Sequence, residues 1–158
     1  MRVLSGSNRR WLDFALRLAL GAAFVYAGAL KIRDPLQFAD NIASFQILPN
    51  MLVNSFALSL PVFEILTGLL LITGFLGRPA SLGILIISAI FVSAVVSALV
   101  RGLTIDCGCF GTSEPSRGRM WFDLGRDAIL LIGAVAAYSY QSTKSVRRSE
   151  VTDRSRRA

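Results

Sequence analysis

Long apolar stretches alternate with short polar segments along the whole chain. Each stretch is long enough to cross the roughly 30 Å hydrocarbon core of a bilayer as a helix, which rises about 1.5 Å per residue. The pattern therefore predicts an all-α integral membrane protein, built as a four-helix bundle. The expected spans are residues 11–30, 51–75, 79–100 and 121–140.

A shorter amphipathic segment lies between the first two spans. Asp34 and Pro35 are typical of the N-cap and first residue of a helix. Phe38, Ile42 and Phe45 then recur at a spacing that places them on one helical face. The segment is therefore predicted to be a short interfacial helix that lies flat on the membrane.

The polar ends of the chain complete the expected domain organisation. Residues 1–10 form a basic N-terminus, residues 11–140 a single membrane domain and residues 141–158 a basic tail. Because the tail is polar and charged, it is predicted to be disordered. We find no internal repeat and no separate soluble domain in the sequence.

Lysine and arginine are distributed unevenly between the two sides of the predicted membrane domain. The termini and the turn at Arg78 carry ten of them, whereas the longer loops on the other side carry five. Since basic segments tend to stay in the cytoplasm, both termini are predicted to be cytoplasmic and the longer loops periplasmic or extracellular. The expected location is the cell (inner) membrane, crossed several times and in contact with lipid.

Composition narrows the possible functions. Hydrophobic residues make up 53% of the chain and the mean hydropathy is +0.56, as expected for a membrane protein. The net charge of +7 comes from basic ends without interleaved aromatic residues, which argues against nucleic-acid binding. The absence of histidine from the sequence excludes Ser-His or Cys-His nucleophilic catalysis and c-type haem attachment.

The two cysteines of the sequence, Cys107 and Cys109, flank Gly108 in the loop before the fourth span. A disulfide needs Cα atoms about 4.4–6.8 Å apart, so closing this small ring requires a turn that glycine can adopt. Strained, exposed disulfides tend to be oxidising and labile. The pair is therefore predicted to exchange electrons rather than to cross-link the fold. Two thiolates without histidine cannot complete a zinc or iron–sulfur site, so no metal is expected.

Two charged residues lie inside the predicted spans at matching depths. Arg17 is about 9 Å from the cytoplasmic face in the first span, and Glu64 is about 10 Å from the same face in the second. Charges inside a membrane are costly unless they are paired. We therefore predict a buried Arg17–Glu64 pair or a shared polar cavity. Its role is either to handle protons or a quinone head group, or only to fix the helix register.

A second group of charges is predicted at the outer end of the fourth span. Asp123, Arg126 and Asp127 share one helical face, and Lys31 ends the first span on the same side. Together with Asp106 they are expected to surround the cysteine loop, where a cation would favour the reactive thiolate. The alternative is a set of ion pairs at helix ends.

These residues resemble the MauE branch of the DoxX-like four-span membrane proteins. The resemblance covers nearly all of the folded part, and the run Asp106-Cys107-Gly108-Cys109-Phe110-Gly111 is its most specific piece. The other matching positions are Arg17, Gly21, Gly28, Lys31, Leu48, Pro49, Pro61, Glu64, Gly68, Trp121, Arg126 and Asp127.

The resemblance implies a role in maturing methylamine dehydrogenase, through processing, transport or disulfide formation of its disulfide-rich periplasmic small subunit. The four-span plan is also similar to that of quinone-linked disulfide-generating membrane proteins, which use two cysteine pairs. This chain has a single pair. Electrons would therefore pass directly to a membrane acceptor, such as a quinone, or to another redox protein.

Three functions remain open from the sequence. A membrane thiol–disulfide oxidoreductase would use Cys107 and Cys109 to exchange with a periplasmic client protein through a mixed disulfide. A non-catalytic scaffold or chaperone subunit would use the same pair to shape a docking loop. Metal handling or small-solute transport is the third, although the paired discontinuous helices of transporters are not visible in the sequence.

Overall fold

The structure is a computed structural model and describes residues 6–105 and 117–157. These residues form helices joined by short connections, and no strand occurs among them. The all-α fold predicted from the sequence is confirmed. The described helices are α1 (Gly6–Arg33), α2 (Pro35–Ser44), α3 (Asn50–Thr73), α4 (Gly77–Val100) and α5 (Arg117–Arg157).

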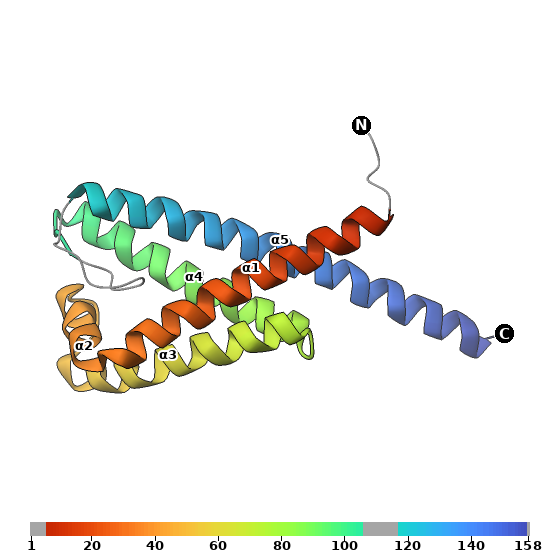
Figure 1. The fold of residues 1–158 in the computed structure, drawn as a ribbon, viewed down its shortest axis with the longest axis horizontal. Coiled ribbons are helices and arrows are strands. Elements are labelled where there is room, and N and C mark those ends of the chain that lie inside the picture. Colours follow the sequence, from red (N-terminus) through yellow and green to blue (C-terminus); the bar gives the residue numbers. More distant parts are fainter. Residues whose placement is uncertain (1–5, 106–116, 158) are drawn as a thin grey trace.

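The long helices form a bundle, and the short helix α2 lies across one of its ends (Figure 1). α1 packs along α3 and α4 packs along α5, while contacts of α3 with α4 and of α1 with α5 join the two pairs. Figure 1 shows that α1 begins and α5 finishes at the end opposite α2. The shared core is made of Leu20, Phe24, Leu71, Ala80, Ile84, Ile87, Ala134 and Ala137.

The outer surface of the bundle is apolar, as a membrane requires. Large side chains such as those of Leu58, Phe63 and Ile132 are exposed along the middle of the helices, where lipid rather than water can cover them. The chain is therefore a membrane helical bundle that contacts lipid. Among the described residues, the helical segments long and apolar enough to cross a bilayer are Trp11–Arg33, Asn50–Thr73 and Gly77–Val100. The predicted fourth span, residues 121–140 of α5, is not among them, and it carries Asp123, Arg126 and Asp127 near its start.

Two helices extend beyond the predicted spans. α1 begins at Gly6, and α5 continues to Arg157 instead of ending near residue 140. The predicted disorder of the tail is therefore wrong. No glycine or proline follows Gly133, and the many arginine residues are good helix formers, so the local sequence does not stop the helix. The cytoplasmic location of the tail stays a prediction.

The predicted short helix is confirmed as α2. The Asp34 carboxylate caps it by accepting a hydrogen bond from the Gln37 N–H at 3.1 Å, with Pro35 in the first turn. Its apolar face, which includes Phe38, packs against Val53 of α3. At the far end of α2, Arg101 donates a hydrogen bond to the Phe45 carbonyl. α2 is thereby attached to both α3 and the end of α4.

Three glycines allow α1 and α3 to approach each other closely. A Cβ atom added to Gly68 would lie 2.7 Å from the Gly21 carbonyl oxygen, and one added to Gly28 would lie 2.8 Å from the Pro61 carbonyl oxygen. Small residues at such contacts are typical of membrane helices, where packing rather than the hydrophobic effect holds helices together. The contacts fix the register of the two helices and bring Lys31 of α1 level with Glu64 of α3.

Candidate functional site

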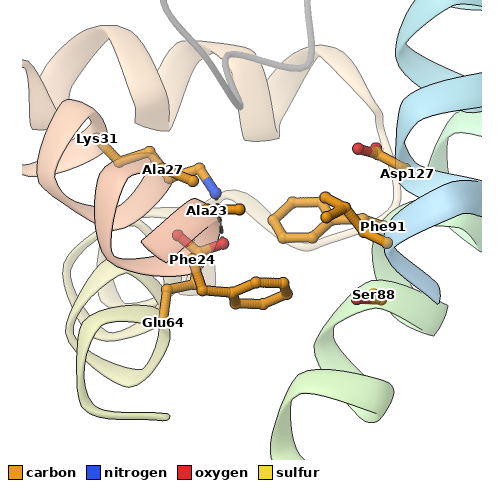
Figure 2. Close-up of a pocket in the computed structure, with 9 residues that line it drawn as sticks. Ala23, Phe24, Ala27, Lys31, Glu64, Ser88, Phe91 and Asp127 are labelled. Atoms are coloured by element: carbon orange, nitrogen blue, oxygen red, sulfur yellow. Dashed lines mark hydrogen bonds and ion pairs between the residues drawn. The ribbon is translucent and has the colours of Figure 1, made fainter. Parts of the chain in front are cut away.

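A buried ion pair joins α1 to α3 near the α2 end of the bundle. Lys31 Nζ lies 2.5 Å from Glu64 Oε1, and the two side chains are only 1% and 2% exposed. Figure 2 shows the lysine reaching from the last turn of α1 down to the carboxylate on α3. Removing both charges from water is costly, so the pair is stable only while both partners stay together.

Two aromatic rings complete the surroundings of the lysine. Lys31 Nζ lies 4.4 Å from the centroid of the Phe91 ring on α4 and 5.1 Å from that of the Phe38 ring on α2. The negative face of an aromatic ring attracts a cation, most strongly where water is excluded. The ammonium group of Lys31 is therefore held by contacts from three other helices, α2, α3 and α4.

A second charged group lies at the start of α5. Arg126 binds both neighbouring carboxylates, with Nη1 3.1 Å from Asp123 Oδ1 and Nη2 2.9 Å from Asp127 Oδ1. Both aspartates are buried. The predicted face of Asp123, Arg126 and Asp127 therefore exists as an ion-pair cluster within one helix.

A cavity is lined by the Lys31–Glu64 pair and by Asp127, and the Phe91 ring lies between them (Figure 2). The cavity has a volume of about 20 Å³, which is room for about one water molecule. Its polar lining comes from Lys31, Glu64, Ser88 and Asp127, and Phe24 and Phe91 are among its apolar residues.

Three buried oxygen atoms around this cavity have no hydrogen-bond partner among residues 6–105 and 117–157. They are Glu64 Oε2, Asp127 Oδ2 and Ser88 Oγ. The residues Ser88 and Asp127 are only 3% and 5% exposed, so bulk water does not satisfy them. The cavity is thus an acceptor-rich site inside the bundle. No group of three or more potential metal ligands occurs in the described part of the chain.

The predicted Arg17–Glu64 pair is wrong. Arg17 instead binds Asp13 one turn earlier on α1, with Nη2 2.8 Å from Oδ2. It lies level with Gly74 at the end of α3, since a Cβ added there would be 3.3 Å from Arg17 Nη1. Gly74 follows Glu64 by ten residues along the chain, so Arg17 lies almost three helical turns away from Glu64. Of the residues predicted at the outer end, the structure brings Lys31 and Asp127 to one cavity.

The predicted cysteine site, comprising Asp106, Cys107, Gly108 and Cys109, lies outside the described residues. The residues that flank it are placed. The Ile105 N–H donates to Met120 Sδ at 3.4 Å, and both residues are buried in one cluster with Ala98. The chain therefore enters and leaves the 106–116 segment from fixed points near α2.

The sequence analysis missed Ser88 and the aromatic residues around Lys31. A signal for Ser88 was present: it continues a series of buried positions spaced three or four residues apart on α4. A serine in the middle of such an apolar face indicates a polar contact or cavity. Phe91 follows Ser88 by three residues on the same helix. Its proximity to Lys31 depends on how α4 is placed in the bundle by its contacts with α3 and α5, which no local pattern encodes.

The fold and site define a membrane helical bundle with a buried ion-pair centre, whose α4–α5 connection carries a Cys-x-Cys sequence. A family described as "Methylamine utilisation protein MauE" matches residues 9–140, and the chain belongs to this MauE family. The wider DoxX-like relationship stays a prediction.

Two curated relatives carry the same description. The chain is 32% identical over 126 residues to the methylamine utilization protein MauE of Paracoccus denitrificans, which covers 78% of this chain and 66% of that protein. It is 32% identical over 127 residues to the MauE protein of Paracoccus versutus, covering 80% and 68%. The match thus spans about two thirds of each relative's length. No solved structure matches the chain.

Proposed function

We propose that this protein acts in methylamine utilisation by maturing a periplasmic client, through thiol–disulfide exchange at Cys107 and Cys109. By the resemblance noted above, the client is the disulfide-rich small subunit of methylamine dehydrogenase. The proposal places the protein in the inner membrane with both termini in the cytoplasm, as the distribution of lysine and arginine predicts. The cysteines then face a compartment in which disulfides persist.

The observation that carries the proposal is where the cysteine segment is attached. Ile105 and Met120 are buried next to each other at the α2 end of the bundle, and Cys107 follows Ile105 by two residues. The same end holds Lys31 and the charged first turns of α5. The only cysteines of the sequence therefore lie in a segment flanked by two residues that are buried at this end of the bundle. Because the distribution of lysine and arginine predicts that this end faces the periplasm, we expect a client there to reach the cysteines without entering the bundle.

The exchange balances without any other group. A client thiolate attacks the Cys107–Cys109 disulfide and forms a mixed disulfide, and a second client thiol then displaces it. The client loses two electrons and forms one disulfide, while the two cysteines gain the electrons and the two thiol protons. A membrane quinone or a second disulfide protein then re-oxidises the cysteines by accepting two electrons and two protons.

A structural role for the Cys-x-Cys sequence is the second candidate. The buried Ile105–Met120 contact favours it, because a short disulfide between fixed points can also shape a docking loop. In this case the chain is a scaffold or chaperone subunit, and no electrons move.

Serine variants distinguish the two candidates. We compare Cys107→Ser with Cys109→Ser. The variant that keeps the attacking cysteine but lacks the resolving cysteine should accumulate a mixed disulfide with the client, because no second thiol is present to release it. The measurement is non-reducing electrophoresis of alkylated membranes, followed by mass spectrometry of the adduct released by a reductant. The Cys107→Ser/Cys109→Ser double variant is the matched control and should trap nothing.

In the double variant, we expect the client to stay reduced while the amount of the membrane protein is unchanged. Normal client disulfides in both single variants, without any adduct, would contradict thiol exchange. A fall in the amount or stability of the protein, together with normally oxidised client, would support the scaffold.

A further inference from the structure

Glu64 and Asp127 use their carboxylate oxygens in the same unequal way. In each, one oxygen binds a cation: Glu64 Oε1 binds Lys31, and Asp127 Oδ1 binds Arg126. The other oxygen, Glu64 Oε2 or Asp127 Oδ2, is buried and accepts no hydrogen bond from the part of the chain that the structure describes. Both carboxylates line the same cavity, together with the equally unpartnered hydroxyl of Ser88. These groups come from α3, α4 and α5.

The charges around the cavity do not balance. In the described part of the chain, α1 contributes Lys31, α3 contributes Glu64, and α5 contributes Asp123, Arg126 and Asp127. α4 contributes the uncharged but polar Ser88. α2 contributes no charge here, only the Phe38 ring that approaches Lys31. Among these described groups, two cations stand against three carboxylates, which leaves one negative charge in a region of low dielectric. Such an excess is costly inside a membrane protein and favours uptake of one positive charge.

We propose that this cavity is a proton-binding site, in which Glu64 or Asp127 carries a proton. The proton converts one carboxylate oxygen into an O–H donor, and the cavity has room for a water molecule that accepts from it. Binding one proton also removes the excess negative charge.

A proton fits the site better than a second full cation does. The ammonium group of Lys31 already lines the cavity, 4.4 Å from the centroid of the Phe91 ring. A sodium, potassium or ammonium ion in the same small space would be repelled by it, whereas a proton on a carboxyl group takes up almost no volume. The inference concerns proton binding only, so it stands independently of thiol exchange at the cysteines.

Infrared spectroscopy of the full chain in lipid nanodiscs tests the proposal. We expect the carbonyl stretch of a protonated carboxylic acid at neutral pH, which disappears as the pH is raised. In Asp127→Asn or Glu64→Gln the cluster is electrically balanced, so the remaining carboxylates ionise and the band should be absent at neutral pH. Asp127→Asn preserves the Arg126–Asp123 contact, and so it remains informative if Glu64→Gln fails to fold. Asp13→Asn, which alters a carboxylate paired with Arg17 outside the cavity, is the matched control and should keep the band.

Three results would overturn the assignment. One is the absence of the acid band from the unmodified protein at neutral pH. Another is persistence of the band in Asp127→Asn. The third is a spectrum that lacks the acid band and changes when sodium is exchanged for potassium or ammonium. This result would identify a cation site instead.

Discussion

Replacing Lys31 with methionine is expected to destabilise the protein by about 3–5 kcal/mol in alkaline buffer, because Glu64 then stays buried without its cation. The loss should become smaller as the pH is lowered, since protonation of the carboxyl group removes the unpaired charge. The measurement is the denaturation of purified protein in mixed micelles, followed by circular dichroism at both pH values.

A double variant shows whether the instability comes from the unpaired charge of Glu64 or from loss of the ion pair itself. Lys31→Met/Glu64→Met should recover most of the lost stability, because apolar residues of similar size often replace a buried ion pair without penalty. Arg17→Met is the control, since it breaks a partly exposed pair and is expected to cost at most about 1 kcal/mol. A Lys31→Met variant no less stable than Arg17→Met would contradict this description of the site. A double variant as unstable as Lys31→Met would contradict it as well.

Substituting Gly68 with alanine is expected to cost about 1–3 kcal/mol, because the added methyl group would meet backbone atoms of α1. It would lie 2.7 Å from the Gly21 carbonyl oxygen and 3.1 Å from the Val25 nitrogen, and neither atom can rotate away. The helices must therefore separate, which also strains the contact between Lys31 and Glu64. The same denaturation assay reports the change.

Gly125 provides the control for this substitution. It lies in α5, and a Cβ atom built there meets nothing within 4 Å. Gly125→Ala should therefore be neutral or slightly stabilising, by up to about 1 kcal/mol, because alanine is the better helix former. Equal effects at Gly68 and Gly125 would mean that close approach of α1 and α3 does not hold the bundle together.

Much of the fold could be predicted because its signals are local. The length and hydropathy of the apolar stretches predict membrane helices, and Asp34-Pro35 marks the start of α2 within a residue. The helical tail is the exception: its composition suggested disorder, yet nothing after Gly133 interrupts a helix.

The site was only partly predictable because it depends on helix register. Lys31, Glu64 and Asp127 were recognised as unusual charges, but the sequence does not say which of them meet. The partner of Glu64 is decided by the close approach of Gly28 to Pro61, which places Lys31 rather than Arg17 beside the carboxylate.

We propose that the Cys107–Cys109 pair exchanges electrons on the outer side of the membrane. The redox state of the pair in intact cells tests this, measured with a membrane-impermeant thiol reagent before and after an impermeant reductant. We expect both cysteines to become labelled in intact cells once reduced, and the oxidised fraction to fall while a client is being synthesised. The double serine variant should give no label. Labelling only after the membrane is permeabilised would contradict the proposed orientation, and a pair that stays fully oxidised throughout client synthesis would contradict the electron exchange.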